Sequence, residues 1–490
     1  MNKIKNIKKG PFKPEWESLR KFECPEWFKD AKLGIWAHWG PQAVPMYGDW
    51  YARNMYIEGH DQYYHHWRKY GHPSEHGWKD IVQKWKAENF DPEGLMDLFV
   101  DAGAKYFCAQ AVHHDNFDNW DSAHNKWNSV NMGPKKDIVG MFKQAAEERG
   151  LPFGVTEHLG ATFSWWSWNK ASDEKGPYAG VPYDGNDPEY KDFYLENEEE
   201  PFLHNQGENW YTDNEAWHKH WFKRIKDLID KYEPELLYTD GPLPFGKYGL
   251  NIVAHLYNLS SEKNNGINQA VYAQKDKNPL VYKTGVYDIE RAVMKEKLSH
   301  PWQTDTSVGD WFYNIKQDYN SAKQIIEMLV DIVAKNGNLL LNFTQLPDGT
   351  LDDECLYILE NMSDWMKVNG EGIFGTRPWY IAAEGDTVVE PKSRFDEPEL
   401  DYTPEDFRFT QKDKNIYAFQ LGWPEDDTAL IKSFAASRGK DLNLVNIKKI
   451  ELLGYEGKLD FQQTDKGLLI KDLPENRPVD YAHCFKINLE

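Results

Sequence analysis

The segment HHDNFDNWD, residues 113–121, places two histidines, three aspartates, a phenylalanine and a tryptophan in nine positions. It follows the apolar run AKYFCAQAV, whose composition is that of a buried strand. Histidines and carboxylates can bind a metal ion, transfer protons, or hydrogen-bond to the hydroxyl groups of a ligand. The segment alone does not distinguish these three kinds of chemistry, so the rest of the chain has to.

Further polar residues stand at the ends of other apolar runs. In a parallel barrel, catalytic groups gather at the carboxyl-terminal ends of the strands. Scattered surface polarity has no reason to collect at strand ends, so we expect these side chains to form one site. Together with His113 and His114, they are His38, Asp49, Trp50, Glu157, His158, Asp240, Glu290 and Arg291.

The histidines are tested first as metal ligands. Consecutive side chains of a strand point to opposite faces, so His113 and His114 can chelate one ion only if the strand has ended. The chain has no H-E-x-x-H, H-x-H or facial-triad spacing. We therefore expect no metal ion, and no motif calls for a cofactor.

Serine or cysteine nucleophiles are not indicated either, because the chain has no G-x-S-x-G and its four cysteines show no C-x-x-C spacing. Carboxylates, imidazoles and indoles are plentiful, and aromatic residues make up 15% of the chain. Two carboxylates across a pyranose ring, with imidazoles on its hydroxyls and an indole on its apolar face, form a glycosidase pocket. Purely structural roles stay open for both carboxylates, because Asp240 precedes a glycine and can cap a turn, and Glu290 can pair with Arg291.

Strands and helices alternate through the first three quarters of the chain. Six apolar runs are typical of buried strands: 33–40, 105–112, 152–159, 235–241, 279–287 and 338–343. Between them lie helical patterns, among them 137–150, 215–232 and 321–337, the last with an apolar stripe and Gly337 as its expected C-cap. This order predicts a parallel sheet, and the number of units favours a closed (β/α)8-like barrel.

The pattern changes near residue 372. Beyond it, alternating stretches such as NIYAFQLGW and CFKINLE are separated by polar turns, which predicts an antiparallel β-sandwich. We therefore expect a catalytic barrel over residues 1–372 and a β-sandwich domain over 373–490. Residues 160–214 are expected to be a long insertion in the barrel, and a loop of this length is usually functional or disordered.

Composition excludes several partners. A net charge of −22 opposes binding to nucleic acid or to anionic membranes, and no run of about 18 apolar residues could span a bilayer. The basic N-terminus has no apolar region after it, so the sequence as given suits the cytoplasm, or the periplasm or exterior if a signal was removed. The expected partner is an oligosaccharide or polysaccharide; the sequence leaves the oligomeric state open.

Several of these segments resemble the α-L-fucosidases of glycoside hydrolase family 29. KLGIWAHWGPQAVPMYGDWYARNMY is similar to the segment that begins the family's barrel, and GAKYFCAQAVHHDNFDNWDS to its second signature. ELLYTDGP resembles the strand that ends in the catalytic aspartate, and NLLLNFTQLPDGTL and NGEGIFGTRPW resemble the last barrel strand and the start of the C-terminal domain. The resemblance runs in order from about residue 22 to 380.

The resemblance implies a retaining exo-glycosidase that works by double displacement. Asp240 would be the nucleophile, and His38, His113 and His114 would bind ring hydroxyls. Asp49 and Trp50 would shape the pocket. The remaining residues expected to contact the substrate are Glu157, His158, Arg291 and Trp302.

Two departures from the family pattern matter. Many members have a glutamate acid/base in a P-W-E motif, but this chain reads PWQTD, and Gln303 cannot donate and recover a proton. Glu290 is the best substitute, in an E-R motif like that of another branch of the family, and Glu157 is a weaker one. Because of Gln303, a non-catalytic carbohydrate-binding protein on a degenerate barrel is kept as the alternative.

The second departure concerns the sugar. In GVTEH, the residues Thr156, Glu157 and His158 stand where many fucosidases have a tyrosine. L-Fucose is 6-deoxy-L-galactose, and an apolar pocket rejects one added hydroxyl by only about 10²-fold. Terminal α-L-fucose and α-L-galactose are therefore both expected substrates.

Overall fold

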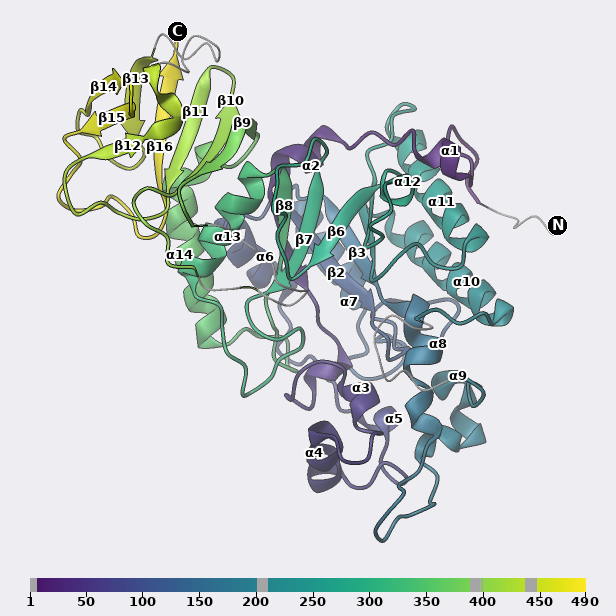
Figure 1. Ribbon diagram of the computed structural model, residues 1–490. Helices are drawn as coiled ribbons and strands as arrows, with labels where there is room; N and C mark the ends of the chain where they lie inside the picture. The colour runs from purple at the N-terminus through teal and green to yellow at the C-terminus, as the bar shows by residue number, and fades with distance from the viewer. Residues whose placement is uncertain (1–6, 201–209, 388–396, 398–399, 437–446) are drawn as a thin grey trace.

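The computed structural model describes residues 7–200, 210–387, 397, 400–436 and 447–490. Its larger part is a closed barrel of parallel strands that pair in chain order, with β8 returning to β1 (Figure 1). The strands are β1 (Leu33–Ala37), β2 (Tyr106–Val112), β3 (Phe153–Glu157), β4 (Leu236–Thr239), β5 (Val271–Gln274), β6 (Val286–Glu290), β7 (Trp302–Ser307) and β8 (Gly337–Asn342). The predicted barrel is confirmed.

The sequence does not predict two of these strands. β5 is only four residues long, too short for a periodic signal, and β7 reads WQTDTS, in which polar side chains face the barrel interior. The run 279–287, predicted as one strand, holds the helical turn α12 (Pro279–Tyr282) and only the start of β6, so that prediction is wrong in part.

Helices surround the barrel, and the three predicted helical patterns are confirmed as α7 (Ile138–Glu148), α10 (Glu215–Tyr232) and α13 (Ala322–Ala334). The others packed around it are α1 (Trp16–Leu19), α2 (Glu26–Ala31), α6 (Pro92–Asp101), α11 (Lys247–Lys263) and α14 (Asp353–Asn369). Gly337 is not the C-cap of α13; Lys335 is, and Gly337 begins β8. A Cβ at Gly337 would lie 2.6 Å from the Trp302 ring, so close packing requires the glycine.

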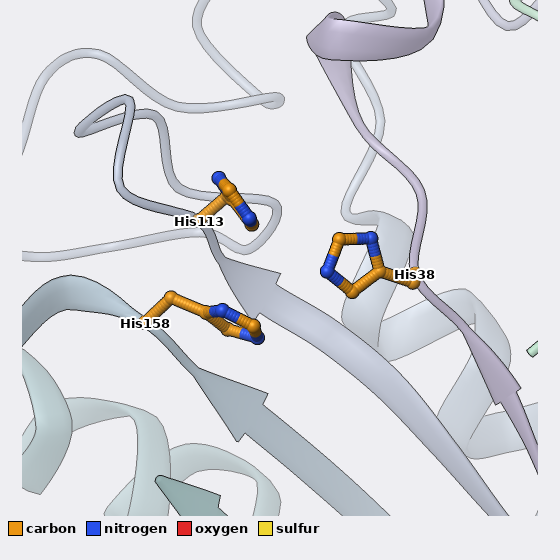
Figure 2. A group of neighbouring side chains, drawn as sticks. All are labelled: His38, His113 and His158. Atoms are coloured by element: carbon orange, nitrogen blue, oxygen red, sulfur yellow. The ribbon is translucent and has the colours of Figure 1, made fainter. Parts of the chain in front are cut away.

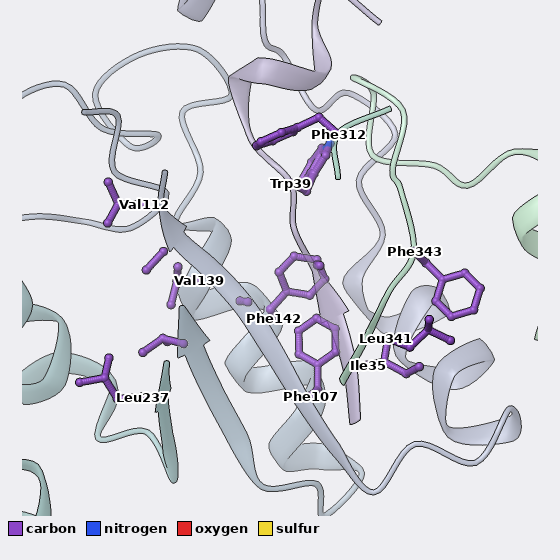
Figure 3. Close-up of a cluster of buried hydrophobic side chains, with 14 of the residues drawn as sticks. Ile35, Trp39, Phe107, Val112, Val139, Phe142, Leu237, Phe312, Leu341 and Phe343 are labelled. Atoms are coloured by element: carbon purple, nitrogen blue, oxygen red, sulfur yellow. The ribbon is translucent and has the colours of Figure 1, made fainter. Parts of the chain in front are cut away.

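Alternation along the strands separates two apolar layers. On β2, Tyr106 and Cys108 belong to a cluster inside the barrel. Phe107 belongs to the cluster between strands and helices, 4.9 Å from the ring of Phe142 on α7 (Figure 3). A side chain at a strand end therefore faces the barrel axis or the helices according to its place in this alternation.

The segment after β1 and the insertion after β3 pack together at the carboxyl-terminal ends of the strands. The first contains η1 (Pro41–Ala43), α3 (Tyr51–Asn54), α4 (Asp61–Tyr70) and α5 (Trp78–Val82); the second contains η2 (Leu159–Ala161), α8 (Thr162–Trp165), η3 (Ser167–Lys170), η4 (Asp184–Asn186), η5 (Pro188–Tyr190) and α9 (Lys191–Tyr194). Buried Asp173 of the insertion accepts hydrogen bonds from Tyr63 at 2.7 Å and Tyr183 at 2.6 Å. In the described residues, no helix is long and apolar enough to cross a membrane.

The C-terminal part is an antiparallel β-sandwich, as predicted. One sheet has the order β13-β16-β11-β10-β9 and the other β12-β15-β14, with an apolar core between them. The elements are η6 (Gly370–Gly372), β9 (Arg377–Glu384), β10 (Phe407–Lys412), β11 (Asn415–Gln420), β12 (Ala429–Ile431), η7 (Lys432–Phe434), β13 (Ile447–Leu452), β14 (Asp460–Thr464), β15 (Gly467–Lys471) and β16 (His483–Leu489). It packs against α13 and α14 of the barrel (Figure 1).

Candidate active site

A cavity of about 620 Å³ opens at the carboxyl-terminal ends of the barrel strands. Eight of the residues singled out in the sequence line it: His38, Asp49, Trp50, His113, His114, His158, Asp240 and Glu290. Seven further side chains line it that the sequence analysis does not single out as site residues: Trp36, Trp210, Tyr238, Pro242, Lys275, Asp305 and Trp311.

Asp240 follows β4 and lies at the centre of the polar contacts. Its Oδ2 is 3.3 Å from His114 Nε2 and 3.3 Å from His158 Nδ1, and its Oδ1 accepts a hydrogen bond from Lys275 Nζ at 2.8 Å. Burial alone would raise the pKa of Asp240, but the Lys275 ammonium and the two imidazoles hold that pKa well below its ordinary value. Asp240 is therefore a carboxylate in the folded protein.

Glu290 is the last residue of β6 and shares Lys275 with Asp240. Lys275 Nζ donates to Glu290 Oε2 at 2.6 Å. Burial raises the pKa of Glu290, and the negative charges of Asp240 and Asp305 add to the rise, while Lys275 opposes it. The pKa of Asp240 is thus lowered and that of Glu290 raised, although both carboxyl groups contact the same ammonium. Such opposite shifts are expected of a nucleophile and an acid.

Asp305 and Tyr238 form the floor beneath this group. The Tyr238 hydroxyl donates to Asp305 Oδ2 at 3.0 Å, and Lys275 Nζ lies 3.6 Å from the same oxygen. Although burial favours the neutral amine, the acidic groups around it, Asp240 first and then Asp305 and Glu290, raise the pKa of Lys275 well above its ordinary value. Lys275 is therefore a fixed positive charge.

Three histidines from the ends of β1, β2 and β3 turn their rings toward a common space (Figure 2). They are His38, His113 and His158, all buried. Burial lowers the pKa of each, and the neighbouring imidazoles lower the pKa of His38 and His113 further. A neutral imidazole offers one donor and one acceptor, which suits a hydroxyl group.

The same histidines could also hold a metal ion. One ligand atom each from His38, His113 and His158 lie within 4.8 Å of one another, and so do those of His114, His158 and Asp240. The sequence argument from strand alternation does not exclude this, because β2 ends at Val112 and both following histidines turn into the cavity.

Three residues expected to contact substrate do not line the cavity. Glu157 faces α10 and accepts hydrogen bonds from Trp221 Nε1 at 3.1 Å and Thr239 Oγ1 at 2.8 Å. Trp302 packs on Gly337 and donates to the Lys335 carbonyl. Arg291 has a φ of 44°, and its guanidinium lies over the Trp311 ring, 5.4 Å from the centroid.

The rest of HHDNFDNWD anchors the two histidines. Arg224 of α10 donates to Asp118 and, at 2.5 Å, to Asn116 Oδ1, and the Arg224 and Asp118 side chains are both 0% exposed. Asn119 donates to the Trp39 carbonyl at 2.8 Å. The segment thus has two kinds of residue: histidines that face the cavity and polar side chains that fix the loop.

Comparisons with known proteins agree with this geometry. The family model described as alpha-L-fucosidase matches residues 1–371, and the model of the alpha-L-fucosidase C-terminal domain matches residues 400–488. The chain belongs to the alpha-L-fucosidase family. It is a glycoside hydrolase, and its barrel with a C-terminal β domain is the arrangement that both family models cover.

The relatives span nearly the whole chain. The tissue alpha-L-fucosidase of Rattus norvegicus is 28% identical over 491 residues, covering 97% of this chain and 92% of the relative. The plasma alpha-L-fucosidase of Homo sapiens is 26% identical over 480 residues, covering 95% and 89%. The Thermotoga maritima alpha-fucosidase in complex with fucose superposes with a TM-score of 0.73 at 24% identity, over 97% of this chain and all of that one, which shows the shared fold.

Within this fucosidase-family barrel, the unpredicted site residues lie where sequence signals are weakest. Lys275 directly follows the four-residue β5, in a run that looks like exposed polar chain. Asp305 alternates inward with Gln303 on β7. Recognising β7 as a strand would have indicated Asp305; nothing in the sequence around Lys275 distinguishes it from a surface lysine.

Proposed function

We propose that the protein is a retaining, exo-acting α-L-glycosidase that removes terminal α-L-fucose or α-L-galactose from oligosaccharides or polysaccharides. Asp240 is the nucleophile and Glu290 the acid/base. The observation that carries the proposal is the bridge made by Lys275, which touches Asp240 at 2.8 Å and Glu290 at 2.6 Å. Two carboxyl groups held by one ammonium fit the separation of roughly 5–5.5 Å typical of retaining enzymes.

Each carboxyl group has the protonation state that its role needs. Asp240, whose pKa is depressed, attacks the anomeric carbon and forms a covalent glycosyl-enzyme. Glu290, whose pKa is raised, protonates the leaving oxygen and then takes a proton from the water that releases the sugar. Glu157, the weaker candidate for this role, has its carboxylate occupied on the α10 side of β3.

Product stereochemistry and leaving-group dependence test these roles. Proton NMR of aryl α-L-fucoside hydrolysis should show the α-anomer as first product; the β-anomer would contradict retention. Asp240→Asn should abolish hydrolysis. Glu290→Ala should slow substrates with poor leaving groups by about 10²–10⁴-fold and activated ones far less. Glu157→Ala is the matched control and should leave the leaving-group dependence unchanged.

The cavity histidines are proposed to bind sugar hydroxyls rather than a metal ion. Their neutral state and their convergence on the space next to Asp240 support this role. Dialysis against EDTA should therefore leave kcat/KM unchanged. A loss restored by zinc would favour the metal-binding alternative instead.

The choice between fucose and galactose is proposed to depend on His158. Its Nε2 is buried and has no hydrogen-bond partner among the described residues, so the cavity wall offers a polar atom where a sugar hydroxyl could bind. His158→Phe should lower the ratio of α-L-galactoside to α-L-fucoside hydrolysis, by up to about 10²-fold. Equal losses on both substrates would mean that His158 acts only on Asp240.

A further inference from the structure

A second pair of acids, Asp288 and Asp305, lies next to the carboxyl groups of Asp240 and Glu290. Strand β6 pairs with β7 so that Asp288 is opposite Gln303 and Glu290 is opposite Asp305. Side chains two residues apart share a face of a strand, so Asp288 lies one layer below Glu290 inside the barrel. Asp288 and Asp305 are each 1% exposed, and the proposed hydrolysis uses neither directly.

One oxygen of each acid has conventional partners. Asp288 Oδ2 accepts a hydrogen bond from Gln303 Nε2 at 2.7 Å, and Gln303 Oε1 accepts one from the Tyr106 hydroxyl at 2.9 Å. Asp305 Oδ2 accepts a hydrogen bond from the Tyr238 hydroxyl and lies near Lys275 Nζ.

The other oxygen, Oδ1 in both Asp288 and Asp305, is buried and has no donor among the described residues. Buried polar atoms are rarely left unpaired. Asp288 and Asp305 are diagonal neighbours on the inner faces of the paired strands β6 and β7. Burial together with the negative charge of Asp305 raises the pKa of Asp288 well above its ordinary value. One proton between the two carboxyl groups would give both orphaned oxygens a partner.

We propose that Asp288 is a positioning residue: it is a carboxylic acid that shares its proton with Asp305 and so fixes the Asp305 carboxylate beneath Lys275. The inference rests on the proposed roles of Asp240 and Glu290. In this position, the negative charge of the Asp305 carboxylate offsets part of the positive charge of Lys275. Glu290 then keeps its proton to higher pH, because the Asp305 charge opposes its ionisation.

The charges around the pair support one retained proton. The titratable groups that face Asp288 from the neighbouring strands are Tyr106, Cys108, Tyr238, Lys275 and Asp305, with Asp240 and Glu290 above them on Lys275. Lys275 is the one cation in this group of described residues. Gln303, which replaces the glutamate of the P-W-E motif, also suits this arrangement. A glutamate at this position would place another acid against Asp288, whereas the Gln303 amide donates a hydrogen bond to it.

Two substitutions of similar size at position 288 distinguish an Asp288 that shares a proton from an Asp288 that is ionised. In Asp288→Asn the amide can donate to Asp305 as the acid does, so the pH profile of kcat/KM should stay as in the wild type. In Asp288→Leu no donor to Asp305 Oδ1 remains, so Asp305 is no longer fixed beneath Lys275, its charge opposes the ionisation of Glu290 less, and the alkaline limb should move down by about one pH unit. An Asn variant that shifts like the Leu variant, or two unshifted variants, would overturn the proposal.

Infrared spectroscopy tests the proton without turnover, and so keeps the test usable if Asp288→Leu does not fold. In a Glu290→Gln background at neutral pH, the difference spectrum between Asp288 and Asp288→Asn proteins should show the carbonyl stretch of a protonated carboxyl group. Absence of that band would refute the proton-sharing pair. Because the band does not depend on catalysis, it persists if only the roles given to Asp240 and Glu290 are wrong.

Discussion

At the scale of single residues, the electrostatics of the site depend on Lys275. Burial works against the ionised form of Asp240, and the Lys275 ammonium is the first of the charges that reverse the effect. Lys275→Met removes that charge without removing much volume. The pKa of Asp240 should then rise, so that less nucleophile is ionised at a given pH and the acidic limb of kcat/KM should move up by about one to three pH units.

Lys275→Arg is the matched control for this prediction. It keeps the positive charge but replaces the compact ammonium by a planar guanidinium with different donor geometry. Turnover should therefore fall while the acidic limb of kcat/KM stays near its wild-type position. An acidic limb that does not move in Lys275→Met would show that His114 and His158 alone keep Asp240 ionised. The pH profiles are best recorded with an activated aryl glycoside, whose departure needs no proton from Glu290.

Which single residues could be predicted follows from strand geometry. His38, His158 and Asp240 follow strong apolar runs and face the cavity, as expected. Glu157 lies between two inward-facing positions, Thr156 and His158, so alternation places it on the helix side of β3. Trp302 directly precedes the inward-facing Gln303 on β7, so alternation places the Trp302 side chain on the helix side as well. Counting faces along each strand would have removed both from the expected site.

At the scale of elements, one buried ion pair holds the histidine-bearing loop against α10. Arg224 and Asp118 are both fully buried. Burial raises the pKa of Asp118 to about 6 even though Arg224 opposes the rise. Arg224→Met should leave an unpaired buried carboxylate and lower the free energy of unfolding by about 3–5 kcal/mol, measured by urea denaturation.

Lys226→Met on the same helix is the control, because Lys226 pairs with the half-exposed Asp230 and an exposed pair contributes at most about 1 kcal/mol. The Arg224 variant should also show a raised KM, since the loop it releases carries His113 and His114. Equal stability of the two variants would mean that Asp118 is neutral in the folded protein and needs no cation.

The elements themselves were predictable where the periodicity is long. The stripe on α13 spans several turns, and all of its predicted apolar residues are buried. β5 and β7 were not predictable because one is too short to show a period and the other faces inward with threonine, glutamine and aspartate. A strand whose inward-facing side chains are polar, like β7, lacks the run of apolar residues by which a buried strand is recognised in a sequence.

At the scale of the whole molecule, the site combines residues that the sequence separates by more than two hundred positions. His38 and Glu290 line one cavity because the eight strands close and bring all their carboxyl ends to one rim. Local patterns predicted the barrel and the β-sandwich, since each rests on short-range periodicity. The contacts between side chains of different strands depend on register, which local patterns do not contain.

The attachment of the β-sandwich to the barrel gives the last prediction. Asp331 on α13 accepts hydrogen bonds from Arg408 of β10 at 2.5 Å and from Lys335 at 2.6 Å, and all three side chains are nearly inaccessible to solvent. Asp331→Ala leaves two buried cations without their carboxylate and should destabilise the protein by about 3–5 kcal/mol.

Asp30→Ala tests the same domain contact at an exposed pair, since Asp30 meets Arg377 of β9 at 2.7 Å with both side chains well exposed. That variant should lose no more than about 1 kcal/mol. Urea unfolding followed by circular dichroism and by residual activity should show the Asp331→Ala protein losing its β-sandwich signal before its activity, because the barrel still closes around its own core. Simultaneous loss of both signals would instead mean that the barrel cannot keep its active site without the β-sandwich, and that the two parts fold as one unit.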